Sequence, residues 1–270
     1  MSGFATFWQG PLPALIRACL ASFPARGAAL TLFSYDGGLD LPEGVTWRDA
    51  REICPDDGLM QRYRLGGRPS LATFSDRFRY EMMALESPCW VDADMLALRP
   101  GGLDEVLIWG RQAEARGKAL INNAVLRLPK GNPVLVDMLA HARAAENQEI
   151  GWGAIGPYLL TEIAEAHGAY ASAAPPERFY PIAPDEFWRL FDPRERDAVT
   201  EAAADSDMAH LWSELLRRVA YDFDAAPPVG SYLADQFTEI GALGRFARVC
   251  GRAEIEALIA RWNVAAPEAP

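Results

Sequence analysis

The sequence predicts an α/β protein with an open, mainly parallel central sheet flanked by helices. The chain opens with a strand-like stretch, a helix-like pattern and a second strand-like stretch, and this order is typical of a parallel sheet. Further apolar stretches alternate with helical patterns downstream. Half of the 270 residues are hydrophobic, which is enough material for a substantial core.

The first third of the chain predicts three strands and one helix. "FATFWQG" is a short aromatic run that ends in glycine, and apolar residues at helical spacing follow Pro11. "AALTLFSYDGG" is a second strand pattern stopped by an Asp-Gly-Gly turn. The elements expected here are strands at 4–10, 28–38 and 44–50, a helix at 12–23, and a loop over 54–69.

A helix with one apolar stripe is predicted between Ser70 and Glu86, and Pro88 ends it. "CWVDADMLAL" then predicts a strand in the interior of the sheet. We expect one domain over 1–265 and a frayed tail at 266–270. The later elements expected are strands at 89–98, 105–112, 118–129 and 177–182, helices at 132–146 and, after a glycine-rich loop, within 151–168, and several helices in the last third.

Composition excludes some classes of protein. The net charge of −11 argues against a nucleic-acid partner and against attraction to anionic lipid. Between 61 and 79, however, five arginines accompany one acid, so this segment either holds a phosphorylated ligand or is an ordinary solvated stretch. Four scattered cysteines fit reduced thiols. No signal peptide and no integral membrane segment is indicated, so we expect a soluble, cytoplasmic protein.

Asp92 and Asp94 follow the apolar strand and are the main candidates for chemistry. Residues two apart point to the same face of a strand, and ligands bind at the carboxyl ends of strands in open α/β sheets. Two close carboxylates repel each other unless a cation lies between them. Mg²⁺ or Mn²⁺ would relieve this repulsion and leave positions for a diphosphate. The other two Asp-x-Asp matches, at 205–207 and 222–224, lie in polar or turn-like sequence, which favours surface acids or helix caps.

Asp76 and Arg79 share one face of the preceding helix. They form either an intrahelical ion pair or a grip on a sugar hydroxyl and a phosphate oxygen.

The stretch "FSDRFRYEMMALESPCWVDADMLALRP" resembles the core of bacterial glycosyltransferases that carry a sugar-binding region with a DXD motif. This group is related to α-1,4-galactosyltransferases and to yeast-type initiating mannosyltransferases. One departure is "LESPCW", which stands where the family commonly has Gly-Gly. The residues that match the pattern are Ser75, Asp76, Arg79, Tyr80, Asp92 and Asp94.

The resemblance implies a GT-A fold, with a nucleotide-sugar-binding part at about 1–130 and an acceptor-side part at about 131–265. It implies a hexosyltransferase of polysaccharide biosynthesis that uses a nucleotide-diphosphate sugar, expected to be a UDP-sugar, with a glycan or lipid-linked glycan acceptor and retention of configuration. Asp92 and Asp94 would hold Mn²⁺ or Mg²⁺ against the diphosphate. His210 either completes the metal shell or is structural.

The same resemblance extends to other stretches. Asn122 and Asn123 would bind sugar hydroxyls, unless they form a turn or bulge. Gly156 would let a loop approach the ligand closely, or it simply precedes a helix. Phe7 and Trp8 would pack on the base, or they are core aromatics. No catalytic base is assigned, because the leaving diphosphate can accept the acceptor's proton and the protein would orient and stabilise charge.

Two other functions remain open. A phosphatase of the haloacid-dehalogenase type would use Asp92 as its nucleophile, but Leu96 stands where that family expects Thr or Val. A non-catalytic nucleotide- or carbohydrate-binding protein with a decayed site is the other alternative. Both acids and the Asp76–Arg79 pair are present, so no decay is indicated.

Overall fold

The computed structural model describes residues 3–101, 103–113 and 119–265, so the tail expected at 266–270 lies outside the described residues. Its centre is a six-stranded sheet in the order β3-β2-β1-β6-β9-β8. β1, β2, β3 and β6 pair in parallel, while β9 is antiparallel to both of its neighbours. The predicted class is therefore confirmed. The strands are β1 (Phe4–Phe7), β2 (Leu30–Ser34), β3 (Val45–Asp49), β6 (Cys89–Val91), β8 (Ile108–Arg111) and β9 (Ile121–Arg127).

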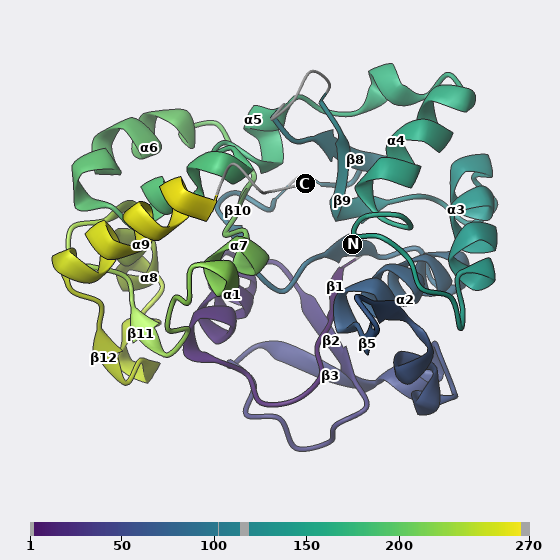
Figure 1. Cartoon of the computed structure of the whole chain (residues 1–270), viewed down its shortest axis with the longest axis horizontal. Helices are drawn as coiled ribbons and strands as arrows, with labels where there is room; N and C mark the ends of the chain where they lie inside the picture. The colour runs from purple at the N-terminus through teal and green to yellow at the C-terminus, as the bar shows by residue number, and fades with distance from the viewer. Residues whose placement is uncertain (1–2, 102, 114–118, 266–270) are drawn as a thin grey trace.

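Helices cover both faces of this sheet (Figure 1). One buried apolar cluster joins the sheet to α1 and to the C-terminal elements, and a second joins it to α2, α3 and α4. In Figure 1 the last helices, α6, α8 and α9, lie on the side of the molecule opposite α3. The helices are α1 (Ala14–Ala25), α2 (Leu71–Leu85), α3 (Pro133–Ala144), α4 (Pro157–Ala166), α5 (Pro176–Phe179), α6 (Arg196–Ala202), α7 (Ser213–Arg218), α8 (Tyr232–Glu239) and α9 (Arg252–Ala265).

The helix α2, which carries Asp76 and Arg79, begins and ends at the predicted signals. The hydroxyl of Ser70 accepts a hydrogen bond from the backbone N–H of Thr73 at 3.2 Å, as an N-cap does. At the other end Ser87 adopts a positive φ of 54° before Pro88, which cannot continue a helix.

No helix among the described residues is long and apolar enough to cross a membrane.

Two predicted strands are wrong in detail. The stretch 89–98 is not one strand, because β6 ends at Val91 and the chain turns, with the N–H of Met95 donating to the carbonyl of Asp92 at 3.0 Å. β7 (Met95–Ala97) then leaves the main sheet and pairs with β10 (Met208–His210). The stretch 177–182 opens as the helix α5, since Pro176 is well suited to the first helical position.

The predicted loop 54–69 contains short elements that have no apolar periodicity to reveal them. A 3₁₀ helix, η2 (Asp57–Arg62), precedes the hairpin of β4 (Arg64–Leu65) and β5 (Arg68–Pro69). Gly66 and Gly67 both have positive φ in its turn, as a tight hairpin turn requires. Near the C-terminus, β11 (Ala225–Ala226) and β12 (Arg248–Val249) form a further two-stranded sheet.

An ion cluster centred on the buried Glu81 ties α2 to α3 through the more exposed Arg143. The carboxylate of Glu81 accepts a hydrogen bond from Nε of Arg77 at 2.8 Å and two from Arg143 at 2.9 and 2.7 Å. Burial acts to raise the pKa of Glu81, but these two arginines outweigh it and lower the pKa. Since the unfolded chain then binds the proton more tightly, the stabilisation is complete above the unfolded pKa of about 4.3 and is lost as the pH falls through the lower folded pKa.

We expect Glu81→Gln to lower the free energy of unfolding at pH 7 by about 3 kcal/mol, because it leaves buried Arg77 without its charged partner. The variant should also lose part of the acid-induced drop in stability that the wild type shows below about pH 5. Glu86→Gln is the matched control, since Glu86 pairs with Arg48 at the surface and should contribute less than about 1 kcal/mol. Urea unfolding across pH measures both, and equal effects of the two substitutions would contradict the assignment.

Candidate functional site

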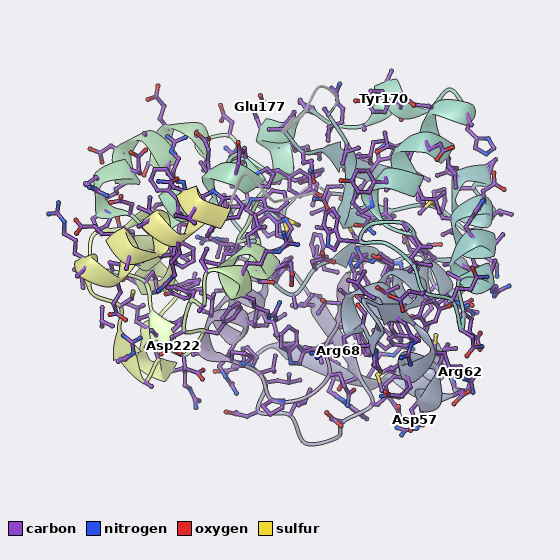
Figure 2. All side chains as sticks on the ribbon, viewed as in Figure 1. Asp57, Arg62, Arg68, Tyr170, Glu177 and Asp222 are labelled. Atoms are coloured by element: carbon purple, nitrogen blue, oxygen red, sulfur yellow. The ribbon has the colours of Figure 1, made fainter. Side chains whose placement is uncertain are left out.

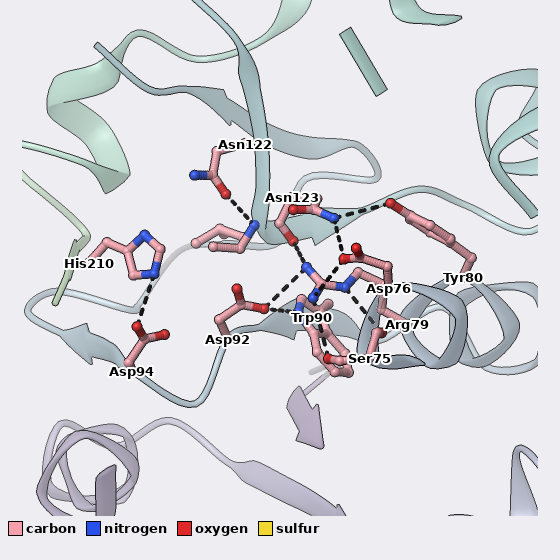
Figure 3. A network of polar contacts seen from close by, with 12 residues as sticks. Ser75, Asp76, Arg79, Tyr80, Trp90, Asp92, Asp94, Asn122, Asn123 and His210 are labelled. Atoms are coloured by element: carbon pink, nitrogen blue, oxygen red, sulfur yellow. Dashed lines mark hydrogen bonds and ion pairs between the residues drawn. The ribbon is translucent and has the colours of Figure 1, made fainter. Parts of the chain in front are cut away.

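Three potential metal ligands converge beyond the end of β6. Asp92, Asp94 and His210 each offer one ligand atom, and these atoms all lie within 4.8 Å of one another. The pairing of β7 with β10, which sets His210 opposite Met95, brings the histidine to the acids (Figure 3). Ligands on opposite sides of one ion lie about 4 to 5 Å apart, twice a typical metal–oxygen distance. Side-chain rotation alone could therefore bring the three atoms onto one cation.

Asp94 and His210 are both buried and interact directly. Nε2 of His210 lies 3.2 Å from Oδ2 of Asp94, and the same oxygen accepts the backbone N–H of Ser213 at 2.8 Å. Burial acts to raise the pKa of Asp94, but the charge and hydrogen bond of His210 hold that pKa well below its usual range. Burial acts to lower the pKa of His210, and Asp94 outweighs it, so that pKa is raised.

His210 also carries an unsatisfied polar atom, which bears on whether a metal fits here. Its Nδ1 is buried and has no hydrogen-bond partner among the residues that the structure describes. A buried ring nitrogen without a partner is costly, and a histidine nitrogen is a common ligand for divalent transition metals. One imidazole and two carboxylates form a donor set that suits Mn²⁺ or Mg²⁺, so the residues present fit such an ion.

Asp92 is held from one side only. Its Oδ1 accepts the indole N–H of Trp90 at 2.7 Å and lies 3.1 Å from Nη1 of Arg79. Its Oδ2 has no such partner in the described part of the chain, and Figure 3 shows it on the side facing away from Arg79. The carboxylate is therefore oriented through one oxygen while the other is available to a ligand.

Arg79 is almost fully buried, and its guanidinium is bonded on every side. Nη1 donates to the carbonyl of Asn123 at 2.6 Å, Nη2 lies 3.1 Å from Oδ1 of Asp76, and both Nε and Nη2 donate to Ser75 at 3.3 Å. The guanidinium also lies over the ring of Trp90, 4.7 Å from its centroid. Arg79 forms the predicted intrahelical pair with Asp76 and, in addition, links that residue to Asp92.

Asp76, Asn123 and Gly156 meet at one point. Nδ2 of Asn123 donates to Oδ1 of Asp76 at 2.8 Å and lies 3.1 Å from the hydroxyl of Tyr80. A Cβ placed on Gly156 would lie 3.2 Å from Oδ2 of Asp76, so the loop approaches this carboxylate closely. Burial raises the pKa of Asp76 to about 6, although Arg79 opposes the shift.

The structure places Asn122 and Phe7, two further predicted site residues, away from open ligand-binding surface. Asn122 donates to Gln112 at 2.7 Å and accepts from the N–H of Ala124, in a stretch of β9 paired out of regular register with β8; the bulge alternative therefore describes its surroundings. Phe7 is buried among Phe74, Phe78 and Tyr35, so it is a core aromatic as its alternative stated.

Trp8 is partly exposed, just beyond the end of β1, with its indole N–H donating to the carbonyl of Pro11 at 3.1 Å. Of the aromatic pair predicted to pack on a base, only Trp8 has ring surface at the carboxyl edge of the sheet.

The basic segment 61–79 is mostly paired within the protein. Arg62 forms ion pairs with Asp56 and Glu146 at 2.7 and 2.8 Å, and it lies at the same corner of the molecule as Asp57 (Figure 2). Arg68 of the β4–β5 hairpin has no ion pair with any described residue. This pattern favours an ordinary charged segment over a phosphate site.

Sequence reasoning missed Trp90 at the site, and it left Trp212 undecided between packing on the base and the core. Trp90 lies two residues before Asp92, so strand periodicity could have placed it on the same face. Trp212 packs on His210 with ring centroids 4.1 Å apart and adopts a left-handed backbone conformation with φ of 54°. No sequence signal reveals that contact, because it depends on how the chain leaves β10.

No family model and no curated protein sequence matches the chain. Among solved structures, the PaToxG glycosyltransferase is similar over 97% of this chain and 85% of that chain, at 14% identity and a TM-score of 0.40. A transferase variant with two cysteine-to-serine substitutions is similar over 62% of this chain and 86% of that chain, at 13% identity and a TM-score of 0.36. Both likenesses are distant and carry no argument about function. Any function is therefore inferred from the residues of the site itself.

We expect Trp90→Phe to weaken Mn²⁺ binding by about 10-fold, because it removes the N–H that orients Asp92 while keeping an aromatic ring in the core. Isothermal titration with Mn²⁺ measures the change. Trp109→Phe is the matched control, since Trp109 is equally buried but donates to Ser172 instead. An unchanged dissociation constant in a folded Trp90→Phe protein would exclude the positioning role.

Proposed function

We propose that this protein is a metal-dependent glycosyltransferase that moves a hexose from a nucleotide-diphosphate sugar, most simply a UDP-sugar, to a glycan or lipid-linked glycan. One observation carries the proposal: Asp92, Asp94 and His210 converge at the carboxyl end of a central strand. That edge is where open α/β sheets bind nucleotides. The resemblance of the segment containing Asp76, Arg79, Asp92 and Asp94 to DXD glycosyltransferases supports the same reaction.

The two acids and His210 would act as metal ligands. Asp92, Asp94 and His210 would hold Mn²⁺ or Mg²⁺, which supplies Lewis-acid stabilisation of the departing diphosphate. Arg79 and Trp90 keep one oxygen of Asp92 occupied, so the other remains available. Asp94 is fixed by His210 and by the N–H of Ser213, which limits its rotation before any ligand arrives.

Two polar side chains next to the metal ligands, Asp76 and Asn123, would bind the hexose. Asp76 and Asn123 lie next to each other on the far side of Arg79, and Gly156 leaves open space where a side chain would crowd them. Carboxylate and amide groups together accept and donate hydrogen bonds to sugar hydroxyls. Holding the sugar here orients its anomeric carbon toward the diphosphate and reduces the entropy cost of reaction.

No side chain is assigned as catalytic base. The leaving diphosphate accepts the proton of the acceptor hydroxyl as the glycosidic bond forms, and the anomeric configuration is retained. The protein contributes orientation and charge stabilisation. The parts proposed for donor and acceptor remain those at about 1–130 and 131–265, and the reaction belongs to cytoplasmic polysaccharide biosynthesis.

We expect Asp92→Asn and Asp94→Asn each to reduce Mn²⁺-dependent hydrolysis of the donor by at least about 100-fold, because each removes a charged ligand. The measurement is nucleoside diphosphate release across a panel of UDP- and GDP-hexoses. Asp205→Asn is the matched control, since Asp205 belongs to another Asp-x-Asp match and is fully exposed. Full activity in both site variants would rule out this function.

Phosphate release and thermal shift, measured beside donor hydrolysis, separate the alternative functions. A phosphatase using Asp92 would release inorganic phosphate from simple phosphomonoesters and would not need a sugar nucleotide. A binding protein would show a metal-dependent rise in melting temperature with a nucleoside diphosphate but no turnover. The proposed transferase should show the thermal shift together with donor hydrolysis and no phosphomonoester cleavage.

A further inference from the structure

Two large aromatic side chains are exposed where the chain enters α4, one on the preceding loop and one in the first turn of the helix. Trp152 and Tyr158 are each 42% exposed. Their rings meet edge to face, with centroids 5.8 Å apart and an interplanar angle of 82°. Most other aromatic residues of the described chain are buried or half-buried, so this pair is an unusual solvent-facing feature.

The polar ends of both side chains are free. Among the described residues, no group accepts from the indole N–H of Trp152 or bonds to the hydroxyl of Tyr158. Six other tryptophans do donate their indole N–H to a protein acceptor. A tryptophan at the surface with an unused donor is well suited to contact a molecule that is apolar on one side and polar at its edge.

The pair is held in place by backbone geometry. Gly153 has a positive φ of 71°, and a Cβ there would lie 2.7 Å from Cδ2 of Tyr158, so only glycine permits the contact between the two rings. The carbonyl of Ile155 accepts the hydroxyl of Tyr80 at 2.9 Å, which ties the loop to α2. Rings fixed before binding lose little entropy when a ligand stacks on them.

The loop also places the pair beside the proposed donor site. Gly156, two residues before Tyr158, lies against Asp76. α4 packs on β9, and β9 lies on the opposite side of β6 from β1 and β2. A nucleotide bound over the ends of β1, β2 and β6 would leave the β9 side open to the second substrate.

We propose that Trp152 and Tyr158 form a stacking platform for the acceptor carbohydrate. This inference rests on the proposed transferase function and extends it to the second substrate. Sugar rings present C–H faces that stack on aromatic rings and hydroxyls that reach free donors and acceptors. Exposed residues close to the pair in the sequence, such as Glu149 and Glu162, are charged. A stable contact with a second copy of the chain would need about 800 Å² per partner, so the ring pair alone is too small for such an interface.

The test uses a printed glycan array probed with the full-length protein in Mn²⁺ and UDP. Trp152→Ala and Tyr158→Ala should each weaken binding to the glycans that the wild type selects by about 10-fold, the usual size of a lost stacking contact. Trp47→Ala is the matched control, because Trp47 is 39% exposed but lies on the edge strand β3 and donates to the carbonyl of Asp36. Titration of UDP should give the same affinity in all four proteins.

Several outcomes would overturn the platform. Glycan binding that survives both substitutions, or that falls equally in Trp47→Ala, excludes it. A wild type that binds Mn²⁺ and UDP but no glycan excludes it as well. A loss of UDP affinity in the platform variants assigns the rings to the nucleotide instead, and conversion of a wild-type dimer to a monomer on sedimentation assigns them to self-association. Wild-type protein that fails to bind UDP or GDP with metal contradicts the transferase, while platform-dependent glycan binding in that protein would still support the stacking site.

Discussion

The site depends on one buried cation. Arg79 lies between Asp76 and Asp92, and its positive charge compensates theirs in a nearly closed environment. An arginine in such a place is tolerated only when its donors are satisfied, and here Ser75 and the carbonyl of Asn123 complete the set. Without this positive charge, three carboxylates on one side of the sheet would repel each other strongly.

This arrangement leaves the local charge unbalanced in a useful direction. Asp76, Asp92 and Asp94 provide three carboxylates, while Arg79 provides one opposing charge and His210 provides a second only when it is protonated. When His210 gives up its proton to act as a ligand, the group has a net negative charge that a divalent cation can compensate. The ion pairs that stabilise the folded protein therefore leave a negative charge that would suit a divalent cation.

The candidate metal ligands and the proposed sugar-binding residues come from different parts of the chain. Asp92 and Asp94 lie at the end of a sheet strand, while His210 and Ser213 come from elements more than one hundred residues later in the sequence. On the other side, Gly156 and Trp152 belong to the loop before α4, and Tyr158 lies in the first turn of α4. Arg79 connects the two groups, because it contacts Asp92 on one side and Asp76 on the other.

The sequence by itself determined the α/β class and the helix with Asp76 and Arg79, and it singled out Asp92 and Asp94 as candidates, because periodicity, caps and closely spaced acids are local signals. It did not reveal that the strand stops at Val91, that 177–182 begins as a helix, or that Phe7 is buried in the core. Only the tertiary structure decided which oxygen of Asp92 is occupied, that Trp90 orients it, and that His210 reaches Asp94. Those features depend on contacts between distant segments, whose geometry is set by the packing of the whole chain.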